Sequence, residues 1–187
     1  METATQRTFI ASVEDRPGVL NRIVSLFRRR GYNIVSLTVG RTHEPGVSRL
    51  TLVTEADADM ARRIQANLYK LVNVLYVEDI TKEDSVVRDL ALIKVTATVE
   101  TRPHVLQLCE VFRARVVDMG VDALTVEITG TPDKLDGLLD VLKPFGILEM
   151  VSTGAIAMTR GARRIPLPSL YPRESDPEIS SAEDLIA

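Results

Sequence analysis

The sequence predicts an α+β protein built from two ferredoxin-like βαββαβ units, the second shorter than the first. Stretches with strand-type alternation and stretches with helical spacing of apolar residues follow one another in the order βαββαβ. An octapeptide near the N-terminus returns 86 positions later in the same strand-to-helix context. With 187 residues, 45% of them hydrophobic, the chain is long enough for two small domains that each bury a core.

The first predicted unit opens with a short β-prone run, residues 8–14, which leads into the turn segment DRPG at residues 15–18. From Val19 the apolar residues fall at helical spacing, and this pattern ends at Gly31 after three consecutive arginines. The unit therefore begins with a strand, a turn and a helix of about three turns.

Two further β-prone runs, residues 33–40 and 48–54, flank a turn-rich HEPG segment and predict a hairpin. Helical spacing returns at residues 58–69, and an alternating, β-branched run follows at 72–80. Right-handed crossovers place both helices on one face of a four-stranded antiparallel sheet. The other face is left open, so we expect the unit to bury a face or an edge by forming at least a dimer.

The second predicted unit rests on an internal repeat. Residues 13–20 (VEDRPGVL) return as residues 99–106 (VETRPHVL), with six of eight positions identical. A weaker match, 49–52 with 123–126, is only 74 positions apart, so the second copy is about a dozen residues shorter. The resulting division is a first domain at 6–80, a linker at 81–88, a second domain at 89–162 and a disordered, proline-rich tail at 163–187.

Composition excludes several classes of protein. The formal net charge of −3 gives no general attraction to nucleic acid or to anionic lipid. No apolar stretch approaches the ~18 residues of a membrane span, and the N-terminus lacks the pattern of a signal peptide, so we expect a cytoplasmic protein. The single cysteine, Cys109, lies in a helically spaced apolar stretch, which favours a buried structural thiol.

We find no catalytic constellation in the sequence. The only two histidines, His43 and His104, lie far apart, and no second cysteine is present to complete a metal site. Glycine-rich phosphate loops and nucleophile motifs are also missing. We therefore expect no catalytic residue, no metal and no cofactor in this chain, which predicts a protein that is not an enzyme.

The turn at residues 15–18 is the candidate site. A glycine before a helix lets a ligand approach the first-turn N–H groups, where the positive end of the helix dipole suits a carboxylate. The competing interpretation is purely structural: Asp15 caps the helix, Pro17 opens it and Gly18 permits the turn. An RNA-recognition domain has the same element order, but the central strands 33–40 and 48–54 carry none of the aromatic residues that stack on bases.

Three runs in the chain carry a resemblance to a known family: VEDRPGVL at 13–20, RGYNIVSLTV at 30–39 and LYKLVNVL at 68–75. Together they resemble the small regulatory subunits of acetohydroxyacid (acetolactate) synthase over about residues 7–162. The resemblance implies that the first domain is an ACT domain, which binds valine, or leucine or isoleucine, where two ACT domains meet in a homodimer.

The resemblance also implies a division of chemistry between two chains. The small subunit is non-catalytic, whereas a large catalytic subunit holds thiamine diphosphate, Mg²⁺ and FAD and makes acetolactate. In this family the small subunit raises the activity of its partner and imposes feedback inhibition by the end product of branched-chain amino acid biosynthesis. The alternative is a free-standing ACT-type sensor that acts on a different partner.

The family pattern implies a set of effector-binding residues. Gly18 and the amides after it hold the effector carboxylate, next to Pro17, and Asn33 of the neighbouring protomer adds a polar contact. Asp15 stands where many members have Asn, and its carboxylate suits the effector ammonium group. Candidates around the branched side chain, which core packing explains equally well, are Val19, Leu20, Ile34 and Val35.

The second copy of the octapeptide keeps six of its residues but replaces the two that could bind a ligand. Thr101 replaces Asp15 and His104 replaces Gly18, so a side chain occupies the path of a carboxylate to the helix. We therefore expect the second domain to bind no amino acid and to contact the catalytic subunit instead.

Overall fold

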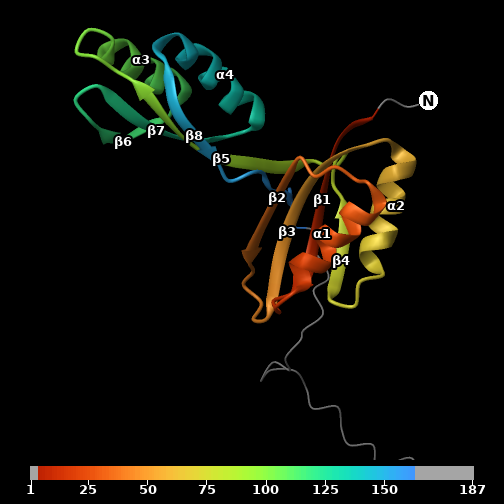
Figure 1. Cartoon of the computed structure of the whole chain (residues 1–187). Coiled ribbons are helices and arrows are strands. Elements are labelled where there is room, and N and C mark those ends of the chain that lie inside the picture. Colours follow the sequence, from red (N-terminus) through yellow and green to blue (C-terminus); the bar gives the residue numbers. More distant parts are fainter. Residues whose placement is uncertain (1–3, 163–187) are drawn as a thin grey trace, which may run out of the picture.

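The computed structural model describes residues 4–162, so the tail predicted at 163–187 lies outside the described residues. The first unit has the predicted order βαββαβ (Figure 1). Its elements are β1 (Thr5–Glu14), α1 (Val19–Arg30), β2 (Ser36–Arg41), β3 (Val47–Ala56), α2 (Ala58–Tyr69) and β4 (Val74–Asp79).

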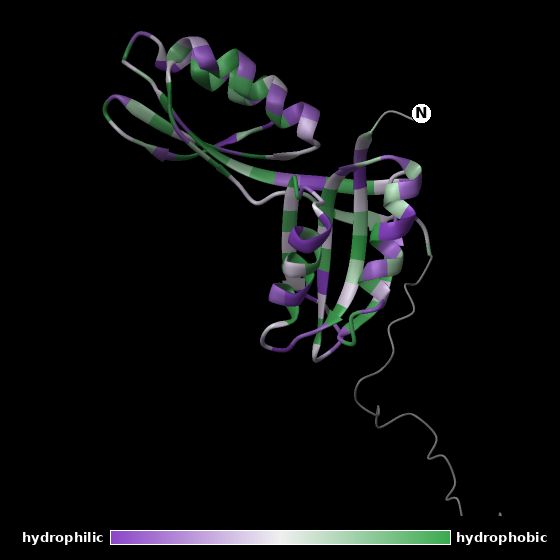
Figure 2. Ribbon diagram, turned by 45° about the vertical axis from the view of Figure 1, so that its right-hand side comes forward, coloured by the Kyte–Doolittle hydropathy of each residue, from purple (hydrophilic) through white to green (hydrophobic). Residues whose placement is uncertain are grey.

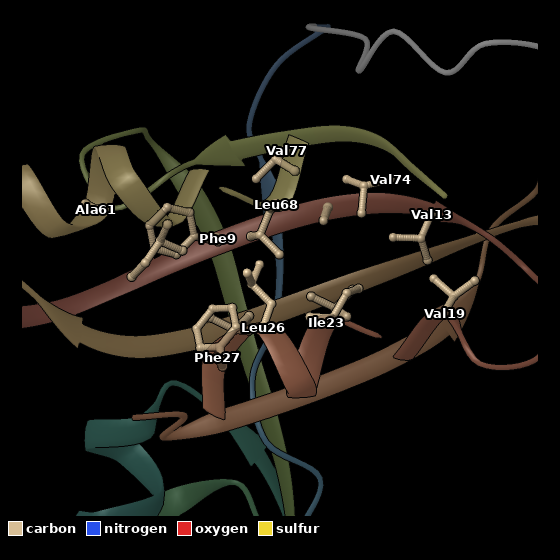
Figure 3. Close-up of a cluster of buried hydrophobic side chains, with 14 of the residues drawn as sticks. Phe9, Val13, Val19, Ile23, Leu26, Phe27, Ala61, Leu68, Val74 and Val77 are labelled. Atoms are coloured by element: carbon tan, nitrogen blue, oxygen red, sulfur yellow. The ribbon is translucent and has the colours of Figure 1, made fainter. Parts of the chain in front are cut away.

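The four strands form one antiparallel sheet in the order β2-β3-β1-β4, and α1 and α2 cover one of its faces (Figure 1). Hydrophobic and hydrophilic residues alternate along the strands, as Figure 2 shows, because successive side chains point to opposite faces. The hydrophobic core lies between this sheet and the two helices and includes Phe9, Ile23, Phe27 and Leu68 (Figure 3).

Helix α1 ends where the sequence predicts, at Gly31. This glycine has φ 68°, and the amides of Gly31 and Tyr32 donate to the carbonyls of Arg28 and Phe27. This is a Schellman motif, which satisfies carbonyls at a helix end. The next four residues form a loop, so β2 begins at Ser36 and Asn33 lies before it, although the sequence predicted a strand from Asn33.

The second unit repeats this arrangement in shorter form and confirms the two-unit prediction (Figure 1). Its elements are β5 (Ser85–Thr96), α3 (Arg102–Phe112), β6 (Arg115–Met119), β7 (Ala123–Gly130), α4 (Pro132–Leu142), the short 3-10 helix η1 (Lys143–Phe145) and β8 (Ile147–Ser152). Its sheet has the order β6-β7-β5-β8, and a separate core of buried residues packs between the sheet and α3 and α4.

The segment between the units differs from the predicted linker. Residues 85–88 are the first part of β5, and they pair with an additional strand, β9 (Ile156–Thr159), which the sequence pattern did not predict. We call this pair of strands the ribbon. Its side chains Val87 and Ala157 pack on Ile10 and Ile80, on the helix-free side of the first sheet. This face, which we expected to be open, is therefore partly covered by the same chain.

A hydrogen bond from Arg49 also attaches the ribbon to the first sheet. The guanidinium of Arg49, on β3, donates to the carbonyl of Ala157 at 2.8 Å. Burial of Arg49 beneath the ribbon lowers the pKa of its guanidinium, and the nearby carboxylate of Glu78 partly offsets this decrease.

Among the helices of residues 4–162, none has the length and the apolar composition that a membrane crossing needs.

Candidate functional site

The turn between β1 and α1 is held open by Gly18. This residue has φ 84°, a conformation that favours glycine, and its carbonyl accepts the amide of Arg22 at 3.1 Å. Helix α1 begins one residue later, at Val19, and no side chain caps it. The capping role considered for Asp15, with Pro17 as the first helical residue, is therefore wrong.

Asp15 instead connects the turn to the β2–β3 hairpin. Its backbone amide donates to the carbonyl of Gly46 at 2.7 Å, and its carboxylate lies 3.8 Å from Nε of Arg41, the last residue of β2. The Arg41 side chain is 90% exposed and that of Asp15 is 47% exposed, and ion pairs at such exposed positions contribute little to stability. The carboxylate of Asp15 is therefore accessible to another cation.

The first turn of α1 offers backbone donors. Among the described residues, the amides of Gly18, Leu20 and Asn21 have no hydrogen-bond acceptor, as is usual for the first residues of a helix. No atom lies within 4 Å of the position that a Cβ on Gly18 would take, so the surface beside the glycine is open. Partial positive charge and an open approach suit an anionic group such as a carboxylate.

The four apolar candidates fall into two groups. Val19 is only 5% exposed and belongs to the core, and Ile34 is partly buried against the same core. By contrast, Leu20 and Val35 are 44% and 45% exposed. Only the latter two present enough apolar surface to contact a bound side chain.

Asn33 lies at the other end of α1 from Gly18. Its carbonyl accepts a hydrogen bond from the hydroxyl of Thr54, which links this loop to β3, and its side chain is exposed in the loop before β2. A helix of 12 residues is about 18 Å long, so these two positions cannot contact the same small amino acid within one chain. A site that uses both residues must include a second chain.

The corresponding turn of the second unit has a different structure. Helix α3 begins at Arg102, three positions earlier in the repeat than α1, so the helix includes His104 where the first unit has Gly18. The Arg102 guanidinium donates to the carbonyls of Ala97, Gly120 and Val121, which ties this end of the helix to the next loop. The open glycine turn is therefore present in the first unit and replaced by helix in the second.

Other groups in the described residues have structural roles. Cys109 is 3% exposed in the core of the second unit, and burial raises the pKa of its thiol, so it is a poor nucleophile. This confirms the structural interpretation of this cysteine. Within residues 4–162 there is no cluster of three or more His, Cys, Asp or Glu side chains that could hold a metal ion.

Comparisons with known proteins match both units. Residues 9–76 match the family described as "AHAS small subunit-like ACT domain", and residues 88–161 match the family "Small subunit of acetolactate synthase". The acetolactate synthase small subunit of Mycolicibacterium smegmatis is 46% identical over 158 residues, which cover 84% of this chain and 93% of that protein. A probable small subunit from Methanothermobacter thermautotrophicus is 44% identical over 154 residues, covering 82% and 92%.

A solved structure agrees with these sequence matches. The acetolactate synthase small subunit of Thermotoga maritima superimposes with a TM-score of 0.78 at 33% identity, over 85% of this chain and 99% of that one. The agreement covers the ACT domain and the second unit together. This chain, with an open glycine turn in its ACT domain and a closed counterpart in its second unit, belongs to the family of acetolactate synthase small subunits.

Proposed function

We propose that this chain acts in the cytoplasm as the regulatory subunit of an acetolactate synthase in branched-chain amino acid biosynthesis. It binds valine, or leucine or isoleucine, raises the activity of a separate large catalytic subunit and makes that activity subject to feedback inhibition. The observation that carries this proposal is the 46% identity with a named small subunit along 93% of its length. This match also favours the synthase over an unrelated partner.

The geometry of β2 supports a homodimer that completes the effector site. β2 is an edge strand, paired only with β3 in the sheet of this unit, and its last residue lies beside Asp15 in the glycine turn. A two-fold axis beside this edge sets the two β2 strands antiparallel. The loop that contains Asn33 in one protomer is then placed beside Gly18 of the other, which gives two equivalent sites per dimer.

The chemistry of this composite site suits a branched-chain amino acid. The amides of Gly18, Leu20 and Asn21 donate hydrogen bonds to the effector carboxylate, and the carboxylate of Asp15 pairs with the effector ammonium group. Leu20 of one protomer and Val35 of the other border the aliphatic side chain with exposed apolar surface. Pro17, which is exposed in the turn, forms the rim of the site.

We assign the second unit, residues 89–162, to contact with the catalytic subunit. The turn before α3 has neither the open glycine nor the carboxylate of the first unit, so it lacks the groups that would bind an amino acid. Exposed apolar residues of the second unit, including Val99, Met119 and Val121, provide surface for a protein contact. Thiamine diphosphate, Mg²⁺ and FAD belong to the partner in this proposal.

Reconstitution with the cognate large subunit tests the proposed function. We expect the chain alone, supplied with thiamine diphosphate, Mg²⁺ and FAD, to form no acetolactate. Added to the large subunit it should raise the rate and confer inhibition by valine, with a coupling free energy of about 1–3 kcal/mol. Turnover by the chain alone, or a large subunit that responds to neither the chain nor valine, would contradict the proposal.

The substitution Asn33→Ala tests whether the neighbouring protomer contributes to the site. We expect valine affinity to fall by about 1–2 kcal/mol, because one polar contact is lost while the dimer and the glycine turn remain. Isothermal calorimetry measures the affinity, and Asn21→Ala is a control because Asn21 contributes only its backbone amide. Equal affinity in the Asn33 variant and the parent would exclude Asn33 from the site.

A further inference from the structure

A short segment of the second unit crosses the edge strand β2 of the first. We call residues 153–155, which connect β8 to β9, the crossing segment. The hydroxyl of Thr38 donates to the carbonyl of Thr153 at 3.1 Å, and the amide of Ala155 donates to Oγ of Ser36 at 3.1 Å. Ser36 and Thr38 alternate along β2, so both point to the helix-free face of the sheet.

The contact between β2 and the crossing segment is close. Gly154 has φ 80°, and a Cβ at this position would clash with Oγ of Ser36 and lie 3.1 Å from Oγ1 of Thr38. A side chain at residue 154 would therefore displace at least the Ser36 hydroxyl, which accepts the hydrogen bond from the Ala155 amide. The two hydrogen bonds and this steric fit join residues more than 100 positions apart in the chain.

The crossing segment is also bonded to the point where β5 passes from one unit to the other. Residues 85–88 of β5 pair with β9, whereas residues 89–96 pair with β7 in the second sheet. At this change of partner, the Thr153 hydroxyl donates to the carboxylate of Asp89 and accepts the amide of Leu90. The Thr153 amide donates to the Leu90 carbonyl at 3.0 Å. Movement of the crossing segment therefore acts directly on the junction between the units.

The ribbon itself contacts the first unit at other strands than the crossing segment does. This contact involves Arg49 on β3 and Ile10 on β1, which are inner strands held by a neighbour on each side. β2 is an edge strand, held within this chain by β3 alone, so it can shift at a smaller loss of hydrogen bonds than the inner strands β1 and β3. The ribbon is thus attached to the inner strands, whereas the crossing segment is attached to the more movable edge strand β2.

We infer that β2 transmits effector binding from the amino-acid site to the second unit through Ser36, Thr38 and the crossing segment. This inference rests on the proposed function. Ser36 follows Asn33 by three residues, so a ligand that draws the 33–35 loop toward the neighbouring glycine turn also moves Ser36. The displacement reaches the β5 junction and reorients the second unit, which contacts the catalytic subunit.

The substitution Gly154→Ala, in the full chain assembled with its large subunit, tests this route. Valine should still bind the variant within about threefold of the parent affinity, since the glycine turn and Asn33 are untouched. The bound valine should inhibit the variant less than the parent. The activity that remains at saturating valine should therefore be at least threefold higher in the variant. Gly161→Ala is the matched control, because Gly161 also has φ 80° but has no atom within 4 Å of the added Cβ. It should be inhibited like the parent.

A second variant removes the contact without backbone strain. Ser36→Ala combined with Thr38→Val deletes both hydroxyls, and it should lose inhibition in the same way while it retains valine binding. In the parent chain, hydrogen exchange of the Ala155 amide should change when valine is added, and this response should disappear in the double variant.

The outcomes separate the inference from the proposed function. Full inhibition of both the Gly154 variant and the double variant, at parent valine affinity, would overturn the route through β2 and leave the effector site intact. Failure of the parent chain to bind valine would overturn the proposed function and, with it, the inference.

Discussion

Gly18→Asp should abolish feedback inhibition while the chain still assembles with its catalytic subunit. The new side chain would fill the open approach to the amides of α1 and place a negative charge where the effector carboxylate binds. The positive φ of Gly18 adds backbone strain at the same point. Valine binding should weaken at least a hundredfold, and calorimetry on the full chain should show no remaining site, because the second unit has no equivalent turn.

Gly161→Asp separates these effects from the general cost of the substitution. Gly161 has a similar φ, 80°, and equally open surroundings, so it carries the same strain and charge at a position far from the proposed site in the sequence. It should retain both valine binding and inhibition. Unchanged valine affinity in a folded Gly18 variant would show that the glycine turn is not the effector site.

Phe27→Ala should destabilise the first unit by about 3–5 kcal/mol. Phe27 is fully buried between α1 and the sheet (Figure 3), and its ring makes an edge-to-face contact with Tyr32 at a centroid distance of 5.6 Å. The truncation leaves a cavity and removes this aromatic contact. Small domains are stable by only about 5–15 kcal/mol, so the change removes a large share of the total.

Chemical denaturation followed by circular dichroism measures this loss. The control is Val72→Ala, since Val72 is 86% exposed in the loop before β4 and its truncation should change the free energy of unfolding by less than about 0.5 kcal/mol. A loss below about 1 kcal/mol for the Phe27 variant would show that this side chain does not hold α1 on the sheet. The loop that contains Tyr32 and Asn33 should become more mobile in the same variant.

The elements that depend on local pattern could be predicted from the amino-acid sequence. Apolar spacing predicted α1 up to Gly31 and α2 at residues 58–69, because a helix that covers a sheet needs one continuous apolar face. The repeated octapeptide identified the second unit, and the DRPG turn identified the glycine that the structure shows in a left-handed conformation. These features are encoded within a few residues of one another.

Other features depend on contacts between residues that lie far apart in the chain, and no local pattern predicts them. Strand β9 has four residues and pairs with residues 85–88, about 70 positions earlier, so no local pattern distinguishes it from a loop. The sequence equally allowed Asp15 to cap α1, but the left-handed Gly18 stands before the helix and turns Asp15 toward Arg41. The crossing segment meets β2 because the ribbon folds back over the first sheet, and such long-range packing depends on the whole chain rather than on the residues in contact.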